Sequence, residues 1–132
     1  MGKAELAKTF SEFLVAEGYR PEIDSDGDVK FKSEGFTYYI IIDEKDPQYF
    51  RLVFPNFWSI ESDAERLKAL IASDFATSRT KAAKVYTVQN NMWASVEFFF
   101  AEPSQVKTVF SRCMSTLRTS VDHYVQKMRE QS

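Results

Sequence analysis

A cluster of acidic residues near the N-terminus is the first candidate for chemistry. The stretch PEIDSDGDVKFKSEGF, residues 21–36, places four acids around a glycine. A calcium loop of the EF-hand type needs acids at positions one, three and five, glycine at six and a bidentate glutamate at twelve. If Glu22 is position one, the spacing fits as far as Gly27, but position twelve is Ser33.

The residues after the acids also argue against a calcium loop. In DVKFKS, Val29 and Phe31 alternate with charged residues, which is the period of a half-buried strand and not of a helix. Asp and Gly favour turns, because Asp can hydrogen-bond its own backbone and Gly can adopt positive φ. The sequence therefore predicts a turn between strands at this point, and no metal site.

No other group of residues has the spacing of a catalytic or cofactor site. The only histidine, His123, and the only cysteine, Cys113, lack the further ligands or the orienting group that a metal site or a nucleophilic dyad needs. The glycines are scattered and form no phosphate-binding motif. A single cysteine excludes an internal disulfide and is typical of the cytoplasm. We therefore predict a cytoplasmic protein that is not an enzyme and has no cofactor.

Length and charge limit the partners. A chain of 132 residues is typical of one domain, here spanning residues 1–132. No apolar run approaches the ~20 residues that span a bilayer, so no membrane contact is expected. The basic run RTKAAK, residues 79–84, precedes the rings of Tyr86 and Trp93. The net charge of −2 nevertheless favours a solvated loop over a nucleic-acid site.

Hydrophobic periodicity predicts an α+β domain. The expected order is helix, three antiparallel strands, helix, two strands and a long helix, with one sheet and the helices packed on one face. The first helix covers residues 4–17 and ends at Gly18. The last helix begins near Pro103 and carries apolar residues at helical spacing as far as Met128.

The first hairpin can be aligned residue by residue. A two-residue turn at Glu34-Gly35 matches the hydrophobic faces of the two strands and pairs Phe31 with Tyr38, Val29 with Ile40, Lys30 with Tyr39 and Lys32 with Thr37. A third strand over 49–54 follows, with Phe50, Leu52 and Phe54 on the inner face. We expect this strand to end at Pro55, because proline cannot donate to a ladder.

The second helix and second hairpin have their own signals. Ser62 and Glu65 can form a capping box, and an apolar stripe is expected on Ala64, Leu67, Ile71 and Phe75. Asn tolerates positive φ, so a turn is expected at Asn90-Asn91. That turn pairs Lys84 with Glu97, Val88 with Trp93, Tyr86 with Ser95, Val85 with Val96 and Ala83 with Phe98.

Large side chains are expected on the sheet face that the helices leave open. This outer face is predicted to carry Tyr39, Ile41, Arg51, Val53, Lys84, Tyr86, Val88, Trp93 and Phe99. Antiparallel sheets often leave one face in water, but an extended apolar patch usually marks an interface. We predict that these residues bind a protein partner or a second copy of the chain, as a homodimer. The alternative is that loops and PNFW, residues 55–58, cover them within the monomer.

Two long stretches resemble a known family. They are DSDGDVKFKSEGFTYYIIIDEKDPQYFRLVFPNFW, residues 24–58, and TKAAKVYTVQNNMWASVEFFF, residues 80–100. Together with the order of the elements, they are similar to the YbjN-type family, within the wider type III secretion chaperone-like fold. Members of that family are described as sensory-transduction regulators, and the related chaperones are small cytoplasmic dimers that hold extended segments of exported proteins. The resemblance implies a chaperone-like or regulatory role and carries no catalytic residue.

The preferred interpretation is a non-enzymatic protein-binding module that uses the aromatic-rich outer face. The alternative is a small-molecule sensor domain with a pocket between the sheet and the C-terminal helix. A doubled mass in size-exclusion chromatography, or capture of a polypeptide, favours the module. A copurified ligand with a monomeric mass favours the sensor.

Overall fold

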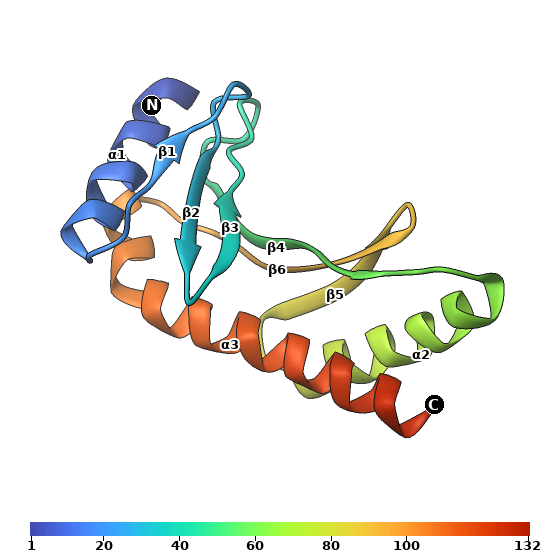
Figure 1. The fold of residues 1–132 in the computed structure, drawn as a ribbon. Helices are drawn as coiled ribbons and strands as arrows, with labels where there is room; N and C mark the ends of the chain where they lie inside the picture. The colour runs from blue at the N-terminus through green and yellow to red at the C-terminus, as the bar shows by residue number, and fades with distance from the viewer.

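The computed structural model describes residues 1–132 as three helices and six strands (Figure 1). The helices are α1 (Lys3–Ala16), α2 (Asp63–Arg79) and α3 (Pro103–Glu130). The strands are β1 (Glu22–Ile23), β2 (Val29–Ser33), β3 (Phe36–Ile40), β4 (Tyr49–Ser59), β5 (Ala83–Val88) and β6 (Asn91–Phe99). They form one antiparallel sheet in the order β1-β2-β3-β4-β6-β5. The predicted α+β class and element order are confirmed, with the short β1 as one additional strand.

The hydrophobic core lies between the sheet and the helices. In Figure 1 the three helices lie along one side of the sheet, with α3 running beneath its whole width. Every helix and the strands from β2 to β6 contribute buried residues to one cluster. Alternate residues of a strand point to opposite faces, so Phe50 and Leu52 point into this core while Arg51 points to the open face. The helices therefore cover the inner face only.

The first hairpin has the predicted register. Phe31 pairs with Tyr38 and Val29 with Ile40 across β2 and β3. The turn residue Glu34 has φ 52°, and Gly35 after it has φ 85°. Positive φ at both positions is the geometry of a type I′ turn, whose twist matches that of the strands.

The turn of the second hairpin lies one residue earlier than predicted, which shifts every cross-strand partner by two residues. Its turn lies at Gln89-Asn90, not at Asn90-Asn91, so Val88 pairs with Asn91 and Tyr86 with Trp93. A shift of two residues keeps every side chain on its predicted face. Contacts from distant segments hold this turn, because Ile60 donates its N–H to the Asn90 carbonyl at 2.8 Å and Arg66 donates to the Asn90 side chain at 2.6 Å.

Strand β4 is longer than predicted, because it does not end at Pro55. The register shifts between Phe54 and Trp58, and pairing with β6 then resumes as far as Ser59. Asn56, inside this irregularity, has φ 54°. A bulge of this kind accommodates a proline, since the extra residues leave the ladder. Because of this extension, β4 pairs with β6 along nearly the whole length of β6, from Phe99 to Asn91.

Helix α2 packs against the core through a different face from the one predicted. Its buried residues are small, namely Ala69, Ala72, Ser73 and Ala76. The predicted stripe is wrong, because Leu67 is 63% exposed and Ile71 is 45% exposed. Small side chains let α2 approach α3 closely, which favours burying alanine over leucine on this helix. The predicted capping contact is confirmed in part, since the Ser62 side chain accepts a hydrogen bond from the Glu65 N–H at 3.1 Å.

Candidate functional site

The register of the sheet brings the nine predicted binding residues onto one face. Directly opposite residues of an antiparallel pair share a face. Tyr39 lies opposite Val53, Val53 opposite Ser95, and Ser95 opposite Lys84, so one row crosses four strands. Neighbouring rows on the same face contain the other six, Ile41, Arg51, Tyr86, Val88, Trp93 and Phe99. We call this set, together with Tyr49, Ser95 and Glu97, the outer sheet face.

Glu97 is the centre of a polar cluster on the outer sheet face. Its carboxylate accepts hydrogen bonds from the hydroxyls of Tyr49 and Ser95. The Lys84 ammonium lies 3.0 Å and the Arg51 guanidinium 3.6 Å from the same Glu97 oxygen. Burial raises the pKa of the Glu97 carboxyl, while the two cations favour its charged form. These bonds connect the side chains of β4, β5 and β6.

The rings beside this cluster are held by hydrogen bonds. Arg51 Nη2 donates to the Tyr86 hydroxyl oxygen at 2.8 Å. Trp93 Nε1 donates to Asn56 Oδ1 at 3.0 Å, so the bulge in β4 fixes the indole. Both rings therefore have a defined position on the surface of the monomer.

The residues of the outer sheet face differ in how far they are exposed to solvent. Phe99 is 76% exposed, and Tyr39, Tyr86 and Trp93 are partly exposed. Val53 is 0% exposed and lies between its cross-strand partners Tyr39 and Ser95. Its role in the predicted surface is therefore to support the rings from beneath and not to contact a partner.

A second apolar surface lies on α2. Leu67, Leu70 and Ile71 are 63%, 49% and 45% exposed. Their spacing of three and four residues puts them on one side of the helix. Sequence reasoning missed this surface because the predicted stripe places Leu67 and Ile71 in the core.

The acidic stretch forms the predicted turn. Asp24 Oδ1 accepts the N–H groups of Asp26 and Asp28 at 2.9 and 3.0 Å, and Gly27 has φ 83°. Asp28 Oδ1 accepts the Ile42 N–H at 2.9 Å and lies 3.3 Å from the Lys3 ammonium. The three Asp carboxylates have oxygens within 4.8 Å of one another. The ion pair with Lys3 connects the turn to α1, and the hydrogen bond from Ile42 connects it to the segment that follows β3.

We expect millimolar calcium to leave the melting temperature unchanged. The turn leads into strand β2 and has no glutamate at the twelfth position, so too few ligands surround an ion. Thermal melts with and without calcium, together with the amide shifts of Asp24, Asp26 and Asp28, test this expectation. A saturable rise of several degrees would show a calcium site.

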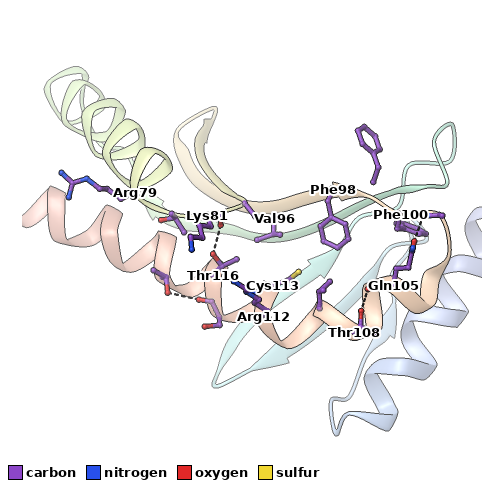
Figure 2. Close-up of a pocket in the computed structure, with 17 residues that line it drawn as sticks. Arg79, Lys81, Val96, Phe98, Phe100, Gln105, Thr108, Arg112, Cys113 and Thr116 are labelled. Atoms are coloured by element: carbon purple, nitrogen blue, oxygen red, sulfur yellow. Dashed lines mark hydrogen bonds between the residues drawn. The ribbon is translucent and has the colours of Figure 1, made fainter.

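A cavity of about 990 Å³ lies between β6 and α3, beside the loop from α2 to β5 (Figure 2). Phe98 points from β6 toward α3, and Arg112 and Cys113 lie on the helix side of the cavity. Burial raises the pKa of the Cys113 thiol to about 11, so this thiol is neutral at physiological pH. The cavity lies between the sheet and the C-terminal helix, where the alternative interpretation as a sensor domain expects a pocket.

Three cations at this cavity have no role in the sequence-based prediction. Arg79 and Lys81 belong to the basic run that was assigned to a solvated loop, and Arg112 lies on α3. The basic run over residues 79–84 was the one feature of the sequence that could have indicated this site. No local pattern connects it to Arg112, because only the packing of α3 under β6 brings the two segments together.

No helix in the structure combines the length and the apolar character needed to cross a membrane. The resemblance to the YbjN-type family stays a prediction, because comparison of the chain with protein families, with curated proteins and with solved structures gives no match.

Proposed function

We propose that this chain is a non-enzymatic protein-binding module, chaperone-like or regulatory, which binds a partner polypeptide or a second copy of itself as a homodimer. The observation that supports the proposal is the open outer sheet face, which carries the rings of Tyr39, Tyr86, Trp93 and Phe99 without a covering helix. Rings of this kind dominate interface energies, because they bury a large area with few rotatable bonds.

The charges on the same face give the proposed interface an orientation. Lys84 is exposed at the edge strand, while Glu97 and Arg51 lie deeper among the rings. A partner acid can pair with Lys84 at the rim, where charges contribute to specificity more than to affinity. Apolar side chains of the partner would then contact Trp93 and Phe99.

The compartment is part of the same proposal. The only thiol, Cys113, is free and buried, as expected for a protein of the reducing cytoplasm. A regulator or chaperone of cytoplasmic polypeptides fits this location.

We expect Trp93→Asp to abolish association while the fold is retained. Trp93 points away from the core, so the change mainly adds a charge to the proposed interface. Removing such an anchor weakens binding by about 2 kcal/mol or more, or roughly thirtyfold. Sedimentation measures self-association, affinity capture with mass spectrometry measures partner binding, and circular dichroism checks the fold.

Two further variants locate the interface. Phe36→Asp is the matched control, because Phe36 is 57% exposed but lies on the other face of the sheet, next to Phe54. It is expected to leave association unchanged. Leu67→Asp tests the apolar side of α2. If Leu67→Asp abolishes association and folded Trp93→Asp associates normally, the interface is on α2 and the outer-face proposal is wrong.

The second candidate function is a small-molecule sensor domain. The cavity of about 990 Å³ between β6 and α3 favours it, because ligand pockets of about 300–1,000 Å³ are typical for small molecules. Native mass spectrometry of the purified chain distinguishes the candidates, since a bound small molecule on a monomer supports the sensor.

A further inference from the structure

The cavity exists because β5 is shorter than its neighbour. β5 begins at Ala83, opposite Val96, whereas β6 continues to Phe99. Ala82 has φ 60°, which turns the chain away from the sheet before it can pair further. The Thr116 hydroxyl donates to the Lys81 carbonyl at 2.8 Å and ties this loop to α3. The space beside β6 that a longer β5 would fill is therefore open, and we call this cavity the groove.

The edge of β6 along this groove has free backbone groups. Phe100 donates its N–H to the Gln48 carbonyl at 2.8 Å. The backbone N–H and C=O groups of even-numbered residues in β6 therefore point toward β4. The N–H and C=O groups of Glu97 and Phe99 therefore point to the side where β5 has ended. They are available for hydrogen bonds with a ligand.

The walls of the groove are apolar toward the sheet. Val96 and Phe100 line the groove from β6 and the residue after it, and both are almost fully buried. Phe98 points from β6 into the space above α3 (Figure 2). Val109 and Cys113 complete this side from α3. An apolar ligand body would gain the usual stabilisation of surface removed from water.

The charges at the groove are all positive. Arg79, Lys81 and Arg112 line it, and its lining includes no aspartate or glutamate. Lys81 and Arg112 have no carboxylate within 4.0 Å, in contrast to Arg51 and Lys84 on the outer sheet face, which pair with Glu97. The Arg79 guanidinium lies over the Phe75 ring, 4.7 Å from its centroid, and points away from the groove (Figure 2). Uncompensated cations in a chain of net charge −2 mark a site complementary to an anion.

We propose that this groove binds an amphipathic carboxylate, a small molecule with one anionic head and an apolar body. The head pairs with Arg112, whose guanidinium can hold a carboxylate through two parallel hydrogen bonds, and with Lys81. The body lies against Phe98 and Val109. This inference rests on the second candidate function, the sensor, and stands independently of partner binding at the outer sheet face.

Three eight-carbon probes separate the head from the body. In isothermal titration calorimetry we expect octanoate to bind at least tenfold more tightly than 1-octanol, and octylammonium to bind most weakly. The amide resonances of Glu97, Phe99 and Val109 should shift on adding octanoate, which places the probe in the groove. Equal affinities for octanoate and octanol, or shifts confined to other residues, would overturn the proposal.

A matched pair of variants on α3 tests the charge. Arg112→Glu is expected to weaken octanoate at least tenfold and to leave octanol unchanged. Lys107→Glu makes the same charge change on an exposed residue of the same helix outside the groove, and should leave octanoate within twofold. Equal losses in both variants would indicate a general electrostatic effect and overturn the site.

Two additional comparisons complete the test. Arg112→Gln removes the charge without reversing it and is expected to weaken octanoate severalfold, with circular dichroism as the fold control. An Arg112→Gln variant that folds and binds octanoate normally overturns the assignment of the head group. Trp93→Asp should bind octanoate normally, so failure of the groove and failure of the outer sheet face are distinguishable.

Discussion

Replacing Phe31 by alanine is expected to lower the free energy of unfolding by about 3–5 kcal/mol. The side chain is 1% exposed and stacks on Tyr38 with ring centroids 5.7 Å apart. It also contacts Tyr19 at 5.1 Å and Phe110 at 5.9 Å. The substitution therefore leaves a cavity where the first hairpin meets α3. Urea unfolding followed by circular dichroism measures the loss.

Phe36→Ala is the control within the same hairpin. Phe36 is 57% exposed and contacts Phe54 with ring centroids 5.5 Å apart. Its loss is expected to cost less than about 1 kcal/mol, because little buried area disappears. Both rings lie on the inner face, so similar losses for Phe31→Ala and Phe36→Ala would contradict the difference in burial between them.

Ala72→Leu should destabilise the protein by about 1–3 kcal/mol, although leucine is also a good helix former. Ala72 is 0% exposed on the buried side of α2, which packs on α3 and β5. The added atoms have no space unless α2 moves away from the elements packed against it. The midpoint of thermal unfolding should fall by several degrees, given the size of the chain.

The neighbouring Ile71→Ala provides the contrast. Ile71 is 45% exposed, so removing most of its side chain is expected to change stability by about 0.5 kcal/mol or less. A tolerated Ala72→Leu together with a costly Ile71→Ala would mean that α2 is rotated by roughly 100° about its axis.

The two hairpins show how far local patterns determine the sheet. At Glu34-Gly35 the turn residues and the alternation of side chains agree on one register, and that register is observed. At the second hairpin the preference of Asn for positive φ favours a turn one residue later than the observed Gln89-Asn90. Ile60 and Arg66 hold the observed turn, and neither contact is visible in the local sequence.

The prediction for α2 was wrong for a different reason. The helical spacing of its apolar residues places Leu67 and Ile71 in the core, but both are exposed. The distance between two helices depends on side-chain size, and a seam of alanines allows α2 and α3 to pack closely. The identity of the buried face therefore depends on the neighbouring helix, which periodicity along one segment does not describe.

The two candidate sites also differ in how far local sequence patterns predict them. The outer sheet face follows from the period of two along each strand, which survives even the two-residue error in the second hairpin. The groove depends on where β5 begins and on the path of α3, both of which are properties of the assembled fold. Arg112 could therefore not be connected to the basic run from sequence.

The cluster around Glu97 has a consequence for the thermodynamics of binding. Ion pairs and hydrogen bonds restrict the rotamers of Arg51, Lys84 and Tyr86 before any partner arrives. Immobilising a flexible side chain on association costs about 0.5–1.5 kcal/mol, and here folding has already met part of that cost. Most of the entropy lost on docking would then come from the partner, so a disordered polypeptide should bind this face with a large unfavourable entropy and a rigid partner with a small one.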